Sequence, residues 1–284
     1  MRLFGTNDAR YYCESFTICT GDSEGSIDSF VRNRLVGRGT TITEGTGVFE
    51  EYRSCSLRNA ERSLFLAMSH YRRCLDHMLP SGSSWAYVTI YYGCWHAAHA
   101  LLGMLGCTIS TKFVIDVIRS TPGIQAFSIR RIGSTPGGEP TTYNGSHEKF
   151  WDLFYRAFIP LRPIVPPHLV AAVSPIASNP TWQIENRNNI NYDTYTALKL
   201  SSDFLQSFST TSFPNSLPGV LGTQYGIFET LLELSCLYAK NLHLETDALS
   251  SFGTGRTFNA KAKKMIYTAL PNLISKSKKK LLLS

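Results

Sequence analysis

The chain has 284 residues, a hydrophobic fraction of 43% and a formal net charge of +7. This length suits one large domain, or one domain with an added end, and the composition allows a substantial core, which excludes a wholly disordered chain. Much of the excess positive charge lies between Lys261 and Lys280. Such a basic end favours nucleic acid or an anionic surface as a partner, and it equally fits a solvated terminus.

Seven cysteines are scattered along the chain without a CxxC pair: Cys13, Cys19, Cys55, Cys74, Cys94, Cys107 and Cys236. An odd number at irregular spacing argues against both a zinc site and a disulfide framework, and predicts reduced thiols in the cytoplasm. The first ten residues lack an apolar stretch followed by a cleavage site, so we expect no secretory signal. We predict no metal and no cofactor.

Residues 1–48 are rich in Gly, Thr, Ser and Asp, with short extended pieces at Tyr11–Thr20 and Gly39–Ile42. We interpret them as a small β or irregular N-terminal segment. Apolar residues then recur at helical spacing from Phe49 to Met78, with charged residues between them, which predicts one amphipathic helix or two in line. Pro80, Ser81 and Gly82 end it.

Residues 84–106 are the most apolar stretch, and no Asp, Glu, Lys or Arg occurs between Leu79 and Thr111. Such a run is either a helix buried on nearly every side or a membrane span. Its histidines, tyrosines and glycines, and the lack of a second span, favour the buried helix, which Gly106 would end. One polar stripe remains on this helix and needs partners, because unpaired buried polar groups are costly. The stripe consists of Thr89, Tyr92, His96 and His99.

The following segments predict further helices around a loop-rich insertion. We expect a short helix at Thr111–Ser120 and a β-hairpin arm at Ile124–Ile132, inside a Gly- and Pro-rich region that continues to Gly145. Ser146 is the expected N-cap of an aromatic-rich helix. Three more helical patterns follow, at Thr194–Phe208, Gly226–Leu242 and Asn259–Leu273. The sequence therefore predicts a mainly α fold, a helical bundle with an extended N-terminal segment and a hairpin insertion.

Residues 183–195 read QIENRNNINYDTY and form a polar stretch with four asparagines between Asn186 and Asn191. Asparagine is a poor residue for a helix interior, so taken alone this run favours turns. Asn179 and Pro180 nevertheless suit a helix start, and Asp193 suits the cap of the next helix. Arg187 would then lie at a helix junction, where its guanidinium can hold a phosphate or a carboxylate.

The pattern YY-G-x-W-H-A-A-H-A-L-L-x-x-L-G, followed downstream by R-N-x-x-N-Y-D, resembles the HEPN superfamily (higher eukaryotes and prokaryotes nucleotide-binding domains). The resemblance covers roughly residues 50–240, within a helical bundle that we place at residues 49–258, between the segment 1–48 and a basic end at 259–284. The matching residues are Tyr91, Tyr92, Ala97, Ala98, Ala100, Leu101, Leu102 and Gly106 in the first motif, and Arg187, Asn188, Asn191, Tyr192 and Asp193 in the second.

The resemblance implies an up-and-down bundle, often paired as a homodimer across the arginine motif. Many members are metal-independent ribonucleases that act as toxins, with a protein antitoxin as partner, or as effectors of antiviral defence. Active members have R-(N/D/H)-x-x-x-(x)-H, which would place Arg187 on the scissile phosphate of an RNA and make Asn188 the orienting residue. Cleavage would leave a 2′,3′-cyclic phosphate. Other members only bind a nucleotide, a nucleic acid or a protein.

This sequence departs from that motif at Tyr192, where active members have histidine. Tyrosine holds its proton at neutral pH, so as a general base Tyr192 would need a strongly depressed pKa. His96, His99 and His147 are the candidates to replace it. His96 and His99 also fit hydrogen-bonded core histidines, or a metal pair that lacks neighbouring ligands, and His147 also fits a capping or surface residue.

Three hypotheses follow from these patterns. The first is a HEPN-like ribonuclease that uses Arg187, Asn188 and either Tyr192 or one of the helix histidines. The second is a non-catalytic HEPN-like module in which Arg187 is an anion clamp for nucleic acid, a nucleotide or a protein partner. The third is a structural helical protein whose Arg187 only satisfies helix ends. For nucleic acid we expect contacts from Arg187, His147, Lys263 and Lys264.

Overall fold

The computed structural model describes residues 27–35, 41–78, 84–109, 113–121, 124–131, 146–158, 167–179, 181–207, 217 and 219–241. Helices dominate these ranges, beside one small sheet, so the predicted mainly α fold is confirmed. The pieces expected at Tyr11–Thr20 and Asn259–Leu273, and the basic end with Lys263 and Lys264, lie outside the described residues.

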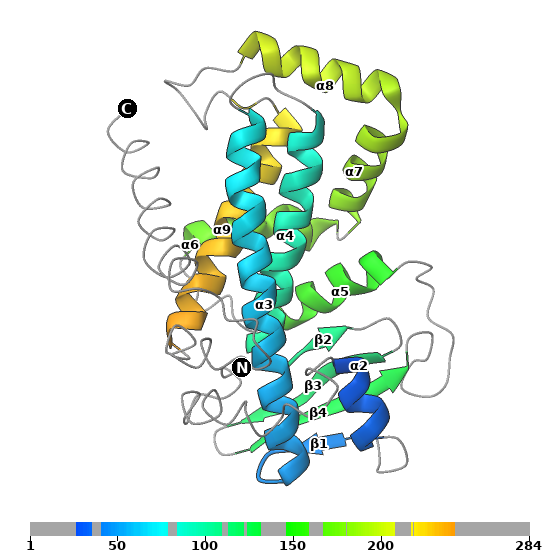
Figure 1. The fold of residues 1–284 in the computed structure, drawn as a ribbon, viewed down its shortest axis with the longest axis vertical. Helices are drawn as coiled ribbons and strands as arrows, with labels where there is room; N and C mark the ends of the chain where they lie inside the picture. The colour runs from blue at the N-terminus through cyan, green and yellow to red at the C-terminus, as the bar shows by residue number, and fades with distance from the viewer. Residues whose placement is uncertain are drawn as a thin grey trace, which may run out of the picture.

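Two long helices form the centre of the molecule (Figure 1). α3 (Gly47–Met78) confirms the predicted amphipathic helix, and α4 (Ser84–Met104) confirms the predicted buried one. α9 (Gly219–Asn241) packs against both. Because α4 has no charged residue, it can be surrounded: α3, α5, α7, α8 and α9 all contact it. Its predicted polar stripe is confirmed as the less buried face, since Thr89, Tyr92, His96 and His99 are all half-buried.

The expected stop of α4 at Gly106 is confirmed. Gly106 has a φ of 79°, which glycine adopts without steric cost. The amide of Cys107 donates to the carbonyl of Leu102 at 2.9 Å, and the amide of Gly106 donates to that of Gly103 at 3.1 Å. This pair of bonds is the Schellman pattern that satisfies the last carbonyls of a helix. The Tyr52 hydroxyl donates to the Gly106 carbonyl at 2.6 Å and fixes this turn to α3.

The sheet has the order β1-β4-β3-β2, with every neighbouring pair antiparallel. Its strands are β1 (Thr41–Thr43), β2 (Thr108–Ile109), β3 (Phe113–Thr121) and β4 (Ile124–Arg131). β4 confirms the expected hairpin arm. The short helix expected at Thr111–Ser120 is wrong, because this segment is β3, the partner strand of the hairpin. Its β-branched residues favour the sheet once β4 is available to pair with them.

The N-terminal segment adds an edge strand and a short helical piece to the sheet end of the molecule. β1 falls where an extended piece was expected, whereas α2 (Ile27–Phe30) and the π-helical turn Val31–Leu35 were not expected. Their buried residues join the inner sides of β1, β3 and β4 and the first turns of α3 in a second hydrophobic cluster. The larger cluster fills the helical bundle, and α3 contributes to both clusters.

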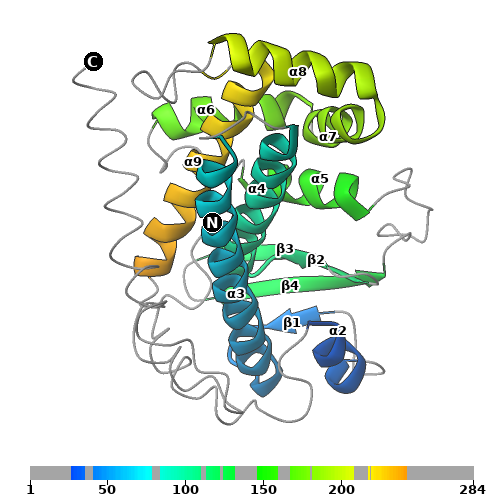
Figure 2. The ribbon, with the colours of Figure 1, turned by 45° about the horizontal axis from the view of Figure 1, so that its top comes forward.

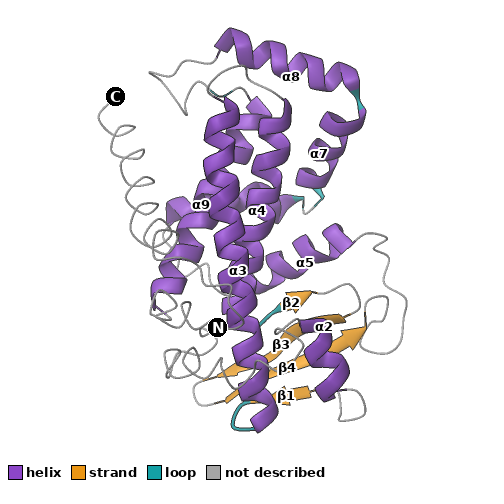
Figure 3. Cartoon of the chain, viewed as in Figure 1, coloured by secondary structure: helices purple, strands orange, loops and turns teal. Residues whose placement is uncertain are grey.

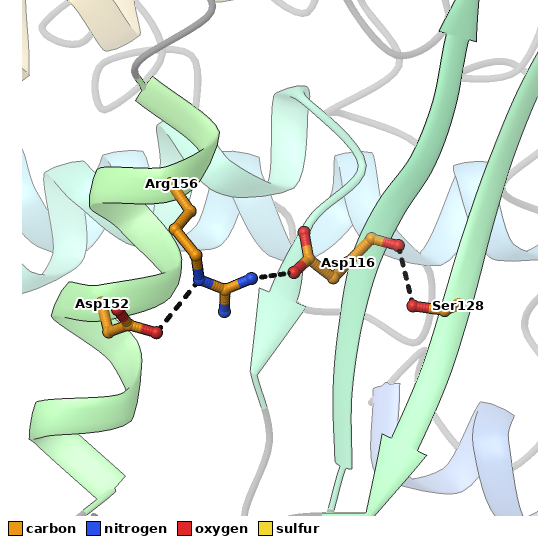
Figure 4. A network of polar contacts seen from close by, with 4 residues as sticks. All are labelled: Asp116, Ser128, Asp152 and Arg156. Atoms are coloured by element: carbon orange, nitrogen blue, oxygen red, sulfur yellow. Dashed lines mark hydrogen bonds and ion pairs between the residues drawn. The ribbon is translucent and has the colours of Figure 1, made fainter. Parts of the chain in front are cut away.

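α5 (Ser146–Phe158) connects the sheet to the bundle, and its start at Ser146 is as predicted. The guanidinium of Arg156 on α5 forms an ion pair with Asp116 on β3, and its Nε donates to Asp152 at 3.1 Å (Figure 4). The Ser128 hydroxyl on β4 donates to the Asp116 carbonyl at 3.4 Å. The turned view in Figure 2 shows α5 between the sheet and the end of the molecule that carries α7 and α8.

α6 (Pro167–Ser178), α7 (Trp182–Tyr192) and α8 (Thr194–Ser207) form the outer part of the bundle. α8 confirms the helix predicted from Thr194. Figure 3 shows strands at one end of the molecule only, with helices forming the rest. Within the described ranges, none of the helices combines the length and the apolar character that crossing a membrane requires.

Candidate functional site

The asparagine-rich stretch is the helix α7, so the expectation of turns is wrong. Glu185 lies in the first turn, where a carboxylate favours the helix end, and it accepts a 2.6 Å hydrogen bond from the Thr181 hydroxyl. The Asn186 side chain donates to the Trp182 carbonyl one turn earlier at 2.8 Å. Asn189 and Asn191 are exposed to water. None of these amides is therefore buried without a partner, which offsets their low helix propensity.

α7 is fixed to the bundle one turn before Arg187. Gln183 is 1% exposed, and its carbonyl oxygen accepts a 2.7 Å hydrogen bond from the amide of Gln224 on α9. The same Gln224 amide donates to the sulfur of Cys94 on α4 at 3.0 Å. Ile190, which follows Arg187 by three residues in α7, is also buried. Because residues three and four apart share a helix face, these anchors turn Arg187 toward α4.

Arg187 is half-buried against the two neighbouring tyrosines of α4. Its Nη1 donates to the Tyr92 hydroxyl at 3.3 Å, and its guanidinium carbon lies 5.3 Å from the centre of the Tyr91 ring, within the range of a cation–π contact. Its Nε and Nη2 both donate to the side-chain oxygen of Asn188, at 3.2 and 2.6 Å. Asn188 therefore holds two of the three guanidinium nitrogens of Arg187 through one side-chain oxygen.

The positive charge of Arg187 has no carboxylate partner among the described residues. The ion pairs of Arg34 with Glu51, of Arg53 with Glu50, and of Arg156 with Asp116 and Asp152 lie elsewhere in the described part of the chain. A guanidinium has five N–H donors, and Asn188 and Tyr92 take up three of those of Arg187. One N–H on each terminal nitrogen remains without an acceptor among the described residues, and such donors can bind a phosphate or a carboxylate oxygen.

His147, in the first turn of α5, is linked to the Arg187 site through Tyr91, which contacts both residues. A hydrogen bond of 2.7 Å joins His147 Nδ1 to the Tyr91 hydroxyl. The imidazole also packs on Trp95, with ring centres 4.2 Å apart. Burial, and then the charge of Arg187, lower the pKa of His147 below its ordinary value, so the ring is neutral at pH 7. Burial raises the pKa of Tyr91, which therefore stays protonated.

The other two candidate histidines lie on α4 outside the Arg187 contacts. His96 stacks on His70 of α3, with ring centres 5.4 Å apart, and His99 stacks on Phe150 of α5 at 4.1 Å. Burial and neighbouring imidazoles lower the pKa of His96 to about 4 and that of His99 to about 3. Among the described residues, neither ring has a hydrogen bond or ring contact with Arg187. Their contacts are those of histidines packed between helices.

Tyr192 lies apart from the cluster that Arg187 forms with α4. It is 80% exposed at the last turn of α7 and, at five residues from Arg187, it points to another side of that helix. Asp193 next to it caps α8, as predicted: its carboxylate accepts hydrogen bonds from the Tyr195 amide at 3.1 Å and from the Thr196 hydroxyl. These hydrogen bonds, chiefly that of Thr196, lower the pKa of Asp193.

The structure thus brings together Arg187, Asn188 and His147 of the predicted residues, and adds Tyr91 and Tyr92 to them. Both tyrosines belong to the matching motif of α4, and Tyr92 lies on its polar stripe, so a sequence signal for them existed. Their contacts with Arg187 could not be derived from it, because they depend on how α7 packs. Within the described ranges, no three His, Cys, Asp or Glu residues gather where they could hold a metal ion.

Comparisons of the chain with protein-family models, with curated proteins and with solved structures found no match.

Proposed function

We propose that this protein is a HEPN-like, metal-independent endoribonuclease in which Arg187 holds the scissile phosphate of an RNA. The observation that supports this most is the guanidinium on α7, which has no ion pair with another described residue and has three of its N–H groups held by Asn188 and Tyr92. A rigid fork of donors with no carboxylate partner among the described residues suits a phosphodiester. The net charge of +7 favours a polyanionic partner.

His147 is the general base of the proposed reaction. Its lowered pKa keeps the ring neutral at pH 7, the state that accepts a proton. In the tautomer that donates Nδ1–H to Tyr91, the other ring nitrogen, which has no hydrogen bond to another described residue, can take the proton of the ribose 2′-hydroxyl. The 2′-oxygen then attacks phosphorus, the bond to the 5′-oxygen breaks, and a 2′,3′-cyclic phosphate forms. Arg187 offsets the charge that builds up on the phosphate oxygens.

His147 supplies the base in this proposal, in place of Tyr192, His96 and His99. Tyr192 is largely exposed and turned away from Arg187 within one chain, although a site shared between two copies would change its neighbours. His96 and His99 pack against His70 and Phe150. The same exposure of Tyr192 favours a second candidate function, a HEPN-like module that binds RNA, a nucleotide or a protein partner at Arg187 without cleaving.

The test is cleavage of a mixed RNA by the purified full-length chain in EDTA. We expect cyclic-phosphate products from the wild type, a loss of activity of at least about 100-fold in Arg187→Ala, and a smaller loss in Arg187→Lys, which keeps the charge but not the fork. Arg34→Ala is the matched control, because it removes an equal charge from a surface pair at the sheet end. It should leave the rate unchanged.

Two other results would contradict the ribonuclease. Salt-sensitive RNA binding that Arg187→Ala abolishes, without cleavage by any variant, would identify the binding module instead. A lower thermal midpoint in Arg187→Ala, with neither binding nor cleavage in the wild type, would assign Arg187 a purely structural role.

A further inference from the structure

The hydroxyl of Tyr92 is a second reactive group at this site. Its oxygen accepts the hydrogen bond from Arg187 Nη1 at 3.3 Å, and no acceptor among the described residues takes its proton. The ring is held by His70, with centres 6.3 Å apart, and by the edge of Tyr91 at 5.3 Å. Tyr92 is half-buried, so a fixed O–H donor lies beside the phosphate clamp.

We propose that Tyr92 is the general acid of the cleavage step, donating its proton to the 5′-oxygen that leaves. This inference rests on the proposed ribonuclease function. As the bond from phosphorus to the 5′-oxygen breaks, its electron pair stays on that oxygen, and the Tyr92 proton moves to it. His147 holds the proton from the 2′-hydroxyl. Transfer of that proton through water back to the phenolate then restores both groups.

The surroundings of Tyr92 support this role. The bond from Arg187 polarises the hydroxyl and becomes a charge-assisted bond to the phenolate that proton transfer leaves behind. Tyr91 is engaged with His147 and is fully buried, so it is less suited to the task. The imidazoles of His96, His99 and His147 are neutral at pH 7, so none of them is an abundant imidazolium acid.

The experiment compares Tyr92→Phe with the wild type on two substrates. One is the dinucleotide UpU, whose leaving alkoxide needs a proton. The other is uridine 3′-(4-nitrophenyl phosphate), whose leaving group departs as a stable anion. Loss of a general acid should slow UpU cleavage by about 100-fold or more and slow the nitrophenyl ester by less than about threefold. His147→Ala should slow both substrates, because both need the base.

Tyr195→Phe, which alters a tyrosine that is 73% exposed, is the matched control and should behave as the wild type on both substrates. An equal loss on both substrates in Tyr92→Phe would overturn the proposal, because it would show that Tyr92 only positions Arg187. Unchanged rates, or a selective UpU defect in Tyr192→Phe instead, would also overturn it. If the wild type cleaves neither these two substrates nor the mixed RNA in EDTA, the ribonuclease itself is wrong and this inference falls with it. A far-UV spectrum and thermal midpoint like those of the wild type show that Tyr92→Phe is folded.

Discussion

Gly93 is the residue that allows α4 and α9 to approach closely. A Cβ atom at this position would lie 2.2 Å from Cζ of Phe228 on α9, which is far inside normal contact distance. Phe228 is fully buried, so its ring has little room to move. The sequence shows a glycine inside a helix, which usually weakens that helix, and only the packing explains why it is present here.

We expect Gly93→Ala to lower the free energy of unfolding by about 2–3 kcal/mol, the cost of overfilling a packed core. The matched control is Gly226→Ala in α9, where a Cβ meets nothing within 4 Å. That change should raise the stability by about 0.5–1 kcal/mol through helix propensity alone. Urea unfolding followed by far-UV circular dichroism measures both. Equal effects in the two variants would contradict the tight contact.

His99 is expected to make the fold sensitive to acid. Its pKa of about 3 in the folded chain lies below the usual 6.5, because burial and the neighbouring His96 and His147 disfavour the charged ring. The unfolded chain therefore takes up the proton first as the pH falls. Stability is complete above about pH 6.5 and decreases toward pH 3, by ~1.4 kcal/mol for each unit.

His99→Phe removes this proton uptake and keeps an aromatic ring against Phe150. We expect the acid-unfolding midpoint to move to lower pH, with little change in stability at pH 7. A circular-dichroism titration from pH 7 to pH 2.5 measures the shift. An unchanged midpoint would mean that other groups control acid unfolding.

At the scale of elements, the helices that could be predicted are those whose pattern is local. The apolar spacing of α3, the uncharged run of α4, the start of α5 at Ser146 and the cap at Asp193 are all readable in the sequence. The local pattern of β3 predicts a helix, whereas a strand depends on its partner, which here is the separate segment β4. The helix at Asn186–Asn191 was missed because its stability comes from Gln183 and Ile190 packing on the bundle, which overrides propensity.

The ion pair between Arg156 and Asp116 joins α5, which holds His147, to the sheet. The Asp116 side chain is 13% exposed and that of Arg156 is 43% exposed, so water screens the pair only in part. A double-mutant cycle with Arg156→Met and Asp116→Asn should give a coupling energy of about 1 kcal/mol, decreasing in 1 M salt. The exposed pair of Arg34 and Glu51 is the control and should couple more weakly. Equal coupling in the two pairs would contradict the partial burial.

At the scale of the whole molecule, the sequence predicted the class of fold but not how the sheet end is built. Buried residues of α2, of the turn Val31–Leu35 and of β1 share one hydrophobic cluster with the hairpin, although about 70 residues or more separate them in the chain. Contacts this distant leave no periodic signal in either segment. For the same reason, the sequence alone could not predict that Arg187 packs against Tyr91 and Tyr92. The residue types of the site, in contrast, are present in the two motifs.

Because α3 contributes to both hydrophobic clusters, we expect the described body to unfold in one transition. All four tryptophans (Trp85, Trp95, Trp151 and Trp182) lie in helices of the bundle, whereas Phe127 is buried at the sheet end against Phe49 and Tyr52. Phe127→Ala should cost about 3–5 kcal/mol and lower the unfolding midpoints seen by tryptophan fluorescence and by circular dichroism equally. A fluorescence midpoint that stays in place would show two independent units.

The reactivity of the buried cysteine thiols can report on separation of the helices that cover them. Cys55, Cys74, Cys94 and Cys107 are buried, and burial raises the pKa of Cys74 and Cys94, so a reactive thiolate is scarce in the folded state. Alkylation of Cys94 therefore requires that α7 and α9 move away from α4. The labelling rate of Cys94, followed by mass spectrometry with and without RNA, would measure how much a ligand on Arg187 reduces the separation of these helices.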